Sequence, residues 1–346
     1  MARKKNGYSV MKKRNKIQPA VQTLTLSTPV VESGASKRFY VDLSQIASIV
    51  NRRFYRQGVN WAVAGFKFVS SGPGTVQVCK LPNTWVTSNA WEKSFRMWDK
   101  QQKDDLEEAG GMSAMAKFRD FKVFMETNHV DDYIASGRDL NITNLLPNGS
   151  SAIGGIPVVV GATGGEWQPS DIVVPNLIPD ASGSEVDPIE YLLHMVGDNN
   201  HLGLSRGMIA GYAQSRSFPQ SPDPVSPSLT SDLNWMRQMF DVGNDNAEVV
   251  ANATGKNDEL PYPQTSYPGG TIQLAGLQVH DVSQIYPTSA TTNVGIARSK
   301  GGNFPCGLIA LDWLPAAGQG NINLGVQIDL VPGNHRGYLC EPMTEM

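Results

Sequence analysis

Residues 60–80 read NWAVAGFKFVSSGPGTVQVCK, and this stretch decides the fold class. The segments 61–69 and 75–80 have the apolar, aromatic and β-branched composition of strands, and the residues 71–74 between them, SGPG, are typical of a turn. We therefore predict two strands joined as a hairpin. Further strand-like stretches lie toward both ends of the chain, at residues 21–30, 38–43, 118–126, 156–161, 171–174, 271–281, 293–298, 306–314 and 321–330.

The order of these stretches favours an antiparallel fold. Few strands alternate with helices, which argues against a parallel sheet. The 346 residues include 34 Gly and 22 Pro without a short repeat, as expected for many strands joined by long, irregular loops. We predict the all-β class and, within it, a single jelly roll, which is an antiparallel β-sandwich that tolerates short helices and long loop insertions.

One longer helix is predicted at residues 89–108. Asn89 can cap its N-terminus, with a glutamate three residues later, and two glycines follow its last residue. Trp91, Phe95 and Trp98 fall on one face of such a helix. This aromatic stripe indicates packing against a core.

Residues 180–270 differ in character from their flanks. A short helix is predicted at 187–197 because a Pro stands at its start and a Gly at its end. The segment 218–228 is rich in Pro, and 228–242 shows apolar residues at helical spacing. We predict a loop-rich insertion that faces outward from the sheets.

The first 16 residues, MARKKNGYSVMKKRNK, carry a strong positive charge. They hold seven basic side chains and no acidic one, whereas the whole chain has a net charge of −3, so the remaining residues carry −10. Such a segment stays disordered until a polyanion neutralises it, and nucleic-acid phosphates are the natural counter-charge. An import signal or a simple solvated tail is the alternative. We predict a nucleic-acid-binding arm at residues 1–19, ahead of a folded domain at residues 20–346, with binding by Arg3, Lys4, Lys5, Lys12, Lys13, Arg14 and Lys16.

A second basic segment, NRRFYR at residues 51–56, interleaves cations with aromatic residues. Guanidinium groups and aromatic faces together bind single-stranded nucleic acid through backbone contacts and base stacking. The alternative is that Phe54 and Tyr55 enter the core while the arginines pair with acids of a neighbouring surface. The predicted nucleic-acid-binding residues in this segment are Arg52, Arg53 and Arg56.

The segment GLSRG at residues 203–207 matches the G-x-S-x-G motif of serine hydrolases, with Ser205 as the nucleophile. That motif requires a strand before the serine and a helix after it. Residues 197–200 indicate a turn and 208–213 a strand, so the required context is missing. We therefore predict that the chain is not an enzyme.

No sequence pattern indicates a metal, a cofactor or a membrane. Cys79, Cys306 and Cys340 are far apart, and the five His residues lack metal-ligand spacing. No segment approaches the roughly 18 apolar residues that could span a bilayer, and no signal peptide is visible. These features predict synthesis in the cytoplasm without a bound cofactor.

Three segments resemble capsid proteins of circular, Rep-encoding single-stranded DNA viruses. They are YVDLSQIASIVNRRFYRQG at residues 40–58, LPNTWVTSNAW at 81–91 and NFPCGL at 303–308, about a tenth of the chain. Their order and the basic arm ahead of them fit that group as well. The resemblance implies a viral single jelly roll as the shell domain, an icosahedral shell of about 60 or more identical subunits, and a small packaged single-stranded DNA genome.

The main hypothesis is therefore a self-assembling structural protein of a virion, whose arm neutralises the genome. Its partners would be identical subunits, genomic nucleic acid and a host receptor that the sequence does not identify, and import into the nucleus is an option. An RNA genome stays open as an alternative to DNA, because small RNA viruses use the same fold with similar arms. Two other hypotheses also stay open: a β-sandwich that binds a carbohydrate or a receptor, and a hydrolase that uses Ser205.

Overall fold

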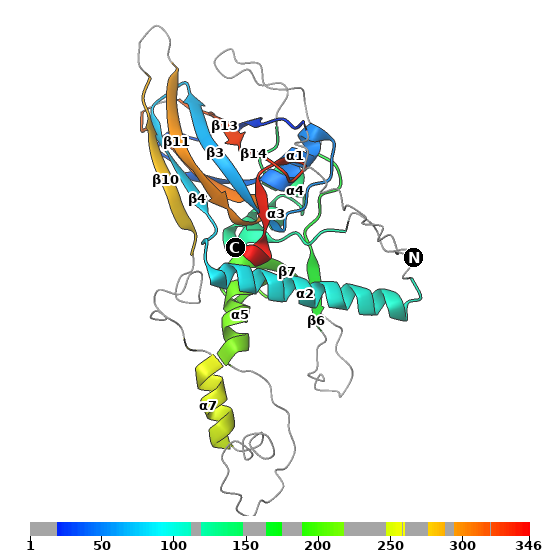
Figure 1. Cartoon of the computed structure of the whole chain (residues 1–346). Helices are drawn as coiled ribbons and strands as arrows, with labels where there is room; N and C mark the ends of the chain where they lie inside the picture. The colour runs from blue at the N-terminus through cyan, green and yellow to red at the C-terminus, as the bar shows by residue number, and fades with distance from the viewer. Residues whose placement is uncertain are drawn as a thin grey trace, which may run out of the picture.

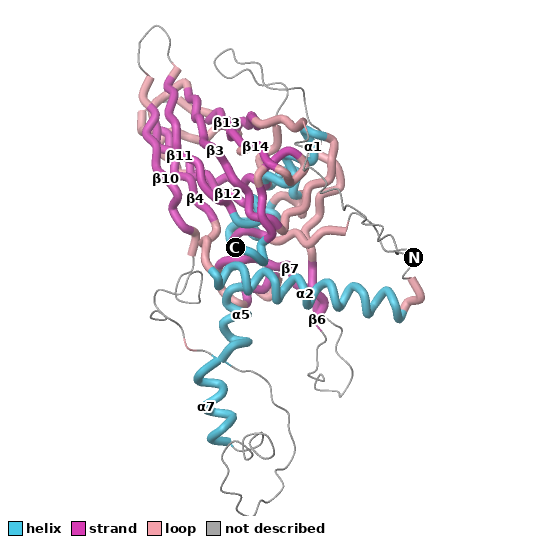
Figure 2. Tube along the Cα trace, viewed as in Figure 1, coloured by secondary structure: helices cyan, strands magenta, loops and turns pink. Residues whose placement is uncertain are grey.

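The computed structural model describes residues 19–111, 119–147, 164–174, 189–217, 247–257, 259, 276–287, 294–318 and 320–346. Its main body consists of two antiparallel sheets (Figure 1). Strands from both ends of the chain contribute to each sheet, and the middle of the chain forms a second body of helices and short strands, as the colouring by secondary structure shows (Figure 2). The described molecule is mostly β-sheet and compatible with a β-sandwich, as predicted.

The first sheet contains the strand that follows the basic arm. Leu24 lies opposite Ile328 and Leu26 lies opposite Val326, and all four side chains are buried. Polar residues alternate with them along the same strands, which is the pattern of a sheet with one buried face. The strand order is β1 (Thr23–Ser27), β13 (Leu324–Leu330), β3 (Val59–Ser70) and β11 (Gly295–Phe304), with β16 (Cys340–Pro342) also paired to β3.

The second sheet closes the other side of the core. Its Trp313 is fully buried, as are Trp61 and Phe68 from the first sheet. Each such aromatic or branched side chain stabilises the fold by about 1.5–3 kcal/mol when it is removed from water. The order of strands is β10 (Gln278–Ile285), β4 (Gly74–Lys80), β12 (Leu308–Pro315) and β2 (Lys37–Asp42), all antiparallel.

The strands β3 and β4 do not form the predicted hairpin. They belong to different sheets, and residues 71–73 carry the chain from one sheet to the other. Phe68 and Val76 therefore meet in the same core from opposite sides. The prediction was wrong because turn residues specify only that the chain reverses; which strands pair is decided by the faces that they bury.

The second body lies between β4 and β10 in the sequence. Its sheet has the order β5-β7-β9-β8 with β6 beside β7, and two of its pairings, β5 with β7 and β7 with β9, are parallel. Figure 1 shows α2 lying across one end of the two large sheets, with α5 and α7 extending away from them. The elements are α2 (Trp85–Glu108), β5 (Phe124–Glu126), α3 (Thr127–Ala135), α4 (Leu140–Thr143), β6 (Asp171–Val174), β7 (Ile189–Val196), β8 (Asn200–His201), β9 (Ser205–Gly207), α5 (Met208–Ser217) and α7 (Ala247–Asn257).

This second body corrects the insertion predicted at 180–270. The inserted chain begins directly after β4, and residues 189–217 form three strands and the helix α5, whereas a short helix at 187–197 and a strand at 208–213 were predicted. The short helix predicted at 187–197 is the strand β7, whose Leu193 and Met195 pack toward α2 while Leu192 packs toward α3. A strand covered on both faces shows no alternation of apolar and polar residues. The Pro and the Gly that flank this strand therefore led to the wrong prediction of a helix. The segments 156–161, 218–228 and 228–242 lie outside the described residues.

The predicted aromatic helix is confirmed as α2, with an earlier start. Its cap is Thr84, whose hydroxyl accepts the N–H of Thr87, so the helix begins four residues before Asn89. Trp91 and Trp98 are buried and, with Phe95, surround the ring of Phe121 at centroid distances of 5.3–5.9 Å. The aromatic stripe therefore holds the second body together.

Candidate nucleic-acid interface

The chain enters the folded domain at residues 19–22, directly before β1. The Val21 N–H donates to Asn51 Oδ1 at 3.0 Å, the Asn51 side-chain amide donates to the Tyr338 hydroxyl at 2.7 Å, and that hydroxyl donates to the Val21 carbonyl at 2.6 Å. Three residues from distant parts of the sequence thus close a ring of hydrogen bonds. We call Val21, Asn51 and Tyr338 the arm clamp, because it fixes the position from which the basic arm leaves.

Tyr338 belongs to β15 (Gly337–Tyr338), which pairs with β14 (Pro332–Gly333). Its ring is fully buried and lies 5.4 Å from the rings of both Tyr55 and Trp61. Burial raises the pKa of Tyr338 to about 12. The hydroxyl therefore keeps its proton at neutral pH and can donate to the arm root.

The helix α1 (Leu43–Asn51) brings the second basic segment to the arm clamp. It begins at Asp42, whose buried carboxylate accepts the N–H groups of Ser44 and Gln45 at 2.9 and 3.3 Å. It ends at Arg52, which adopts the left-handed conformation with φ of 53° and turns the chain away. Cations after the last turn of a helix are favoured by its dipole, so this end of α1 suits the arginines that follow.

Two loops interlock beside the arm clamp. The Arg53 guanidinium and the Tyr55 hydroxyl both donate to the Arg336 carbonyl, at 3.4 and 3.0 Å, and the Arg336 guanidinium donates to the Phe54 carbonyl. Arg56 donates to a backbone carbonyl at 2.7 Å. The resulting set of cations, which we call the arginine cluster, is Arg52, Arg53, Arg56 and Arg336.

The arginine cluster has one acidic neighbour within the described parts of the chain: burial raises the pKa of Asp120, and the charge of Arg56 partly offsets this rise. None of its four side chains forms an ion pair there, and their recorded side-chain hydrogen bonds go to backbone carbonyls. Arg52, Arg56 and Arg336 are exposed. The neighbouring His335 adds no further positive charge at neutral pH, because burial and the nearby Arg336 lower its pKa. Exposed cations without acidic partners can take phosphate groups as their counter-ions.

These contacts decide between the two interpretations of residues 51–56. Tyr55 is fully buried, and Phe54 is half-buried with its ring 6.4 Å from that of Trp167. Base stacking on Tyr55 is therefore excluded, as the core interpretation held. The pairing of the arginines with acids, which the same interpretation expected, is not found among the described residues. The arginine cluster is therefore suited to contacts with the phosphate backbone of a nucleic acid, rather than to base stacking.

Part of the interface lay beyond sequence reasoning, and the predicted arm is not covered by the structure. The predicted residues Arg3, Lys4, Lys5, Lys12, Lys13, Arg14 and Lys16 lie outside the described residues. Arg336 and Tyr338 were not predicted, because nothing in a single sequence links them to a segment more than 280 positions earlier. Asn51 was read only as part of the basic segment, and its role in the arm clamp appears only in the fold.

The sequence argument against a nucleophilic Ser205 was wrong about the chain after the serine, whereas residues 202–204 before it do form a turn. Ser205 stands in the strand β9, and the helix α5 follows, so residues 208–213 are not a strand. The serine is the first residue of β9, opposite Leu192, rather than at the turn into the helix. Its side chain is fully buried, and its hydroxyl has no hydrogen-bond partner in the described structure.

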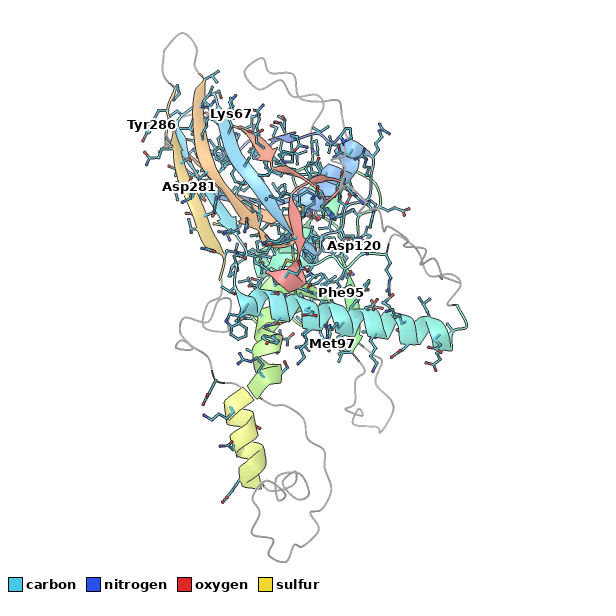
Figure 3. All side chains as sticks on the ribbon, viewed as in Figure 1. Lys67, Phe95, Met97, Asp120, Asp281 and Tyr286 are labelled. Carbon is cyan, nitrogen blue, oxygen red and sulfur yellow. The ribbon has the colours of Figure 1, made fainter. Side chains whose placement is uncertain are left out.

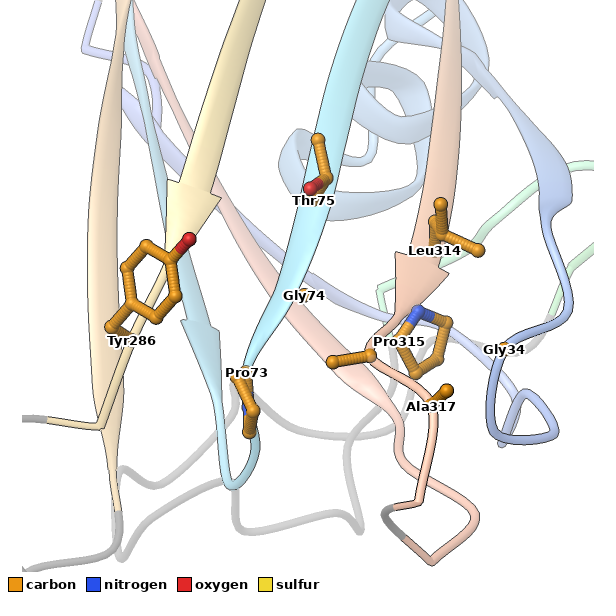
Figure 4. A pocket seen from close by; sticks show the side chains of 9 residues that line it. Gly34, Pro73, Gly74, Thr75, Tyr286, Leu314, Pro315 and Ala317 are labelled. Carbon is orange, nitrogen blue, oxygen red and sulfur yellow. The ribbon is translucent and has the colours of Figure 1, made fainter.

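The opposite end of the sandwich presents a different surface. There the β3–β4 turn, the end of β10 and the residues after β12 enclose a pocket of about 310 Å³ (Figure 4). Among the described residues that line it, the exposed Tyr286 is the one aromatic side chain and none is charged. The arginines that follow α1 lie at the other end of the sandwich. The lining residues are Gly34, Pro73, Gly74, Thr75, Tyr286, Leu314, Pro315, Ala316 and Ala317.

Neither a protein-family model, nor a curated protein, nor a solved structure matches the chain. Among the described residues, no group of three or more His, Cys, Asp and Glu side chains could hold a metal ion. Likewise, none of the described helices combines the length and the apolar character needed to cross a membrane.

Proposed function

We propose that the chain is a viral coat protein whose copies assemble into a closed shell and whose basic arm and arginine cluster bind the packaged genome. The observation that carries this proposal is the position of the arm clamp beside the arginine cluster. Seven cations of the arm are thereby tethered next to four more, and no ion pair with an acid neutralises those four within the described chain. Such a concentration of charge binds phosphates without reading sequence, which is what packaging requires.

The strand order supports the finer fold assignment, a viral single jelly roll. Numbered one to eight along the chain, β1, β2, β3, β4, β10, β11, β12 and β13 fall into the sheets 1-8-3-6 and 5-4-7-2. This is the order expected when an antiparallel ribbon is rolled into two facing sheets of four strands. In this assignment the second body is one long insertion between the fourth and fifth strands, in line with the tolerance of the fold for insertions.

Exposed apolar side chains on the second body support contacts between subunits. Met97 and Val174 border an apolar depression of about 510 Å³ between α2, β6, β7 and α5. Ile189, which lies directly opposite Val174 in the β6–β7 pair, and Leu204 are also exposed. Identical copies that meet through such surfaces bury them, as oligomers commonly do.

Single-stranded DNA is the proposed cargo. The arginine cluster offers four positive charges and contains no aromatic side chain, so it would contact the sugar-phosphate backbone of a flexible strand. The resemblance of residues 40–58, 81–91 and 303–308 to capsid proteins of circular single-stranded DNA viruses favours DNA over RNA. Extraction of co-purified nucleic acid, followed by separate DNase and RNase digestion, distinguishes the two.

Electron microscopy of the purified full chain tests the proposal, together with a variant that lacks residues 2–16. The full chain should form closed shells with an absorbance ratio at 260 and 280 nm typical of nucleoprotein. The deletion removes seven cations and none of the buried residues that the structure describes, so its shells should have a clearly lower ratio. A matched control replaces the seven cations with Gln and keeps the length of the arm. Small particles only, for the full chain, would contradict shell formation; an unchanged ratio in both variants would contradict the role of the arm.

A further inference from the structure

The outward face of the first sheet carries three cations on two neighbouring strands. Arg298 on β11 lies directly opposite Lys67 on β3, and Lys300 follows two residues later, opposite Gly65. The residues on either side of Lys67, Phe66 and Phe68, are buried in the core. Lys67 therefore points away from the core, and Figure 3 shows it on this sheet. We call Lys67, Arg298 and Lys300 the sheet cations.

The side chains of the sheet cations lack direct ion-pair partners in the described part of the chain. Arg298 and Lys300 are exposed. Side chains directly opposite each other in an antiparallel pair have Cβ atoms only about 4.5–5.5 Å apart, and like charges at such positions destabilise the sheet. The arrangement is therefore unfavourable for the isolated chain, and a bound anion would reverse this.

The acids nearest to this face are engaged elsewhere. The Asp329 carboxylate, two strands away from Lys300, accepts the Thr23 hydroxyl at 2.6 Å. The Asp281 carboxylate accepts the Ser299 hydroxyl at 2.6 Å and the Lys300 backbone N–H at 3.1 Å. The hydrogen bond from Ser299 lowers the pKa of Asp281 and the charge of Lys300 also contributes, although the hydrogen bond between Lys300 and Asp281 comes from the Lys300 backbone.

Neutral polar side chains extend the same row across the sheet. Gln327 on β13 lies next to Lys67, and Thr25 on β1 lies next to Gln327. The row thus offers a guanidinium, an ammonium, an amide and a hydroxyl group in succession, all of which can donate to phosphate oxygens. Its last strand, β1, is the continuation of the basic arm, which leaves the domain only two residues before Thr23 at Val21.

We propose that this face is a second phosphate-binding surface, on which the sheet cations bind the backbone of the packaged single strand. The inference rests on the proposed function and adds a site that neither the arm nor the arginine cluster includes. A sulfated polysaccharide would satisfy the same charges. Nucleic acid is favoured because the arm, which would hold the genome, is attached at the edge of this sheet.

The test compares two triple variants of the full chain. The first replaces the sheet cations with Gln: Lys67→Gln, Arg298→Gln and Lys300→Gln. The control makes the same change in charge at exposed positions of α2: Arg96→Gln, Lys100→Gln and Lys103→Gln. Fluorescence anisotropy measures binding of an oligo-dT and of a heparin fragment at several salt concentrations, and the absorbance ratio of purified shells reports their nucleic-acid content.

Loss of three phosphate contacts should flatten the dependence of log K for oligo-dT on log salt by about 2, since each contact contributes about 0.7 for a single strand. The shells of the first variant should still form and contain less nucleic acid, whereas the control should match the unmodified chain in both measurements. An unchanged slope and content in the first variant would overturn the proposal. Weaker heparin binding with unchanged oligo-dT binding would overturn it in favour of a polysaccharide surface.

A measurement on the unmodified chain keeps the proposal testable if the first variant does not assemble. Lysine acetylation of shells, before and after nuclease treatment, should show Lys67 and Lys300 becoming more reactive once the nucleic acid is digested, with Lys100 and Lys103 unchanged. Equal reactivity before and after digestion would contradict the site. Failure of the proposed function looks different: the unmodified chain itself would then form no shells, or shells without nucleic acid.

Discussion

The Arg38 guanidinium lies 2.6 Å from the Glu126 carboxylate and joins the two bodies of the chain. Arg38 belongs to β2 in the second sheet and Glu126 to β5 in the inserted body, and the Glu126 side chain is fully buried. The same guanidinium donates two hydrogen bonds to Asp312, at 2.6 and 2.8 Å, and the Tyr40 hydroxyl donates to Glu126 at 2.7 Å. This network fixes the insertion to the sheet from which it departs.

Replacing Arg38 with Met should destabilise the protein strongly. The variant leaves Glu126 as a buried carboxylate without a cation, and breaking a buried pair in this way costs about 3 kcal/mol. Urea denaturation measures the change in the free energy of unfolding. The matched control is Arg96→Met, which removes an exposed ion pair with Glu92 and should change stability by less than about 0.5 kcal/mol. Equal effects of the two variants would argue against the network.

Replacing Asn51 with Ala should loosen the arm root without unfolding the domain. The Val21 N–H loses its acceptor and the Tyr338 hydroxyl loses a donor, at a cost of about 1–2 kcal/mol. Hydrogen exchange of the Val21 amide should become about 10-fold faster or more, since 1.4 kcal/mol corresponds to a factor of ten. Asn303→Ala, at an exposed side chain of β11, is the control and should leave this amide unchanged.

His194 should make stability fall in acid. It is fully buried in β7, its Nε2 lies 2.9 Å from the Asp198 carbonyl, and burial lowers its pKa to about 4. In the unfolded chain the pKa is about 6.5, so the unfolded state binds the proton first, and the stability from neutral His194 is lost between about pH 6.5 and pH 4.

The His194→Gln variant isolates this contribution because Gln can donate to Asp198 and does not titrate. The free energy of unfolding of the unmodified chain, minus that of the variant, should fall by about 3 kcal/mol between pH 7 and pH 4. If the free energies of unfolding of the two proteins changed with pH in parallel, His194 would not be the source of the loss of stability. Taking the difference is necessary because Asp120 acts in the opposite direction: burial raises its pKa to about 6, so its protonation stabilises the fold as the pH falls.

Lys67→Gln should stabilise the protein that is free of nucleic acid. Removing one of two cations that face each other across β3 and β11 relieves a repulsion of about 0.2–1 kcal/mol. The gain should shrink as salt rises, because mobile ions screen exposed charges. Thermal unfolding at low and high ionic strength measures both effects. Lys100→Gln on α2 serves as the control, and a gain of equal size there would point to net charge rather than to the opposed pair.

The strands of the large sheets could be predicted because each buries one face. Leu324, Val326 and Ile328 alternate with outward residues, and this period survives in the sequence. Pairing could not be predicted in the same way, as the separation of β3 and β4 into two sheets shows. The prediction for β7 was wrong for a further reason. Other elements cover both of its faces, so apolar and polar residues do not alternate along it.

The candidate interface was predictable only where its residues are consecutive. Arg52, Arg53 and Arg56 stand in one short segment, so their composition reveals them. Arg336 joins them through a loop near the end of the chain, and Lys67 meets Arg298 only through the register of β3 and β11. Such sites depend on contacts between remote segments, which local patterns do not contain.

The pairing of β1 with β13 has a consequence for synthesis of the protein. The arm and β1 leave the ribosome first, yet Thr23 has to wait for Asp329, and Tyr338 of the arm clamp is made later still. Contacts of such long range form slowly, and unpaired strands are prone to aggregation until they do. A chain that stops before β13 keeps the edge of β3 open and its arm unanchored. Only chains that extend past Tyr338 can therefore present the arm from a paired β1, and in the proposed shell this requirement would exclude incomplete chains.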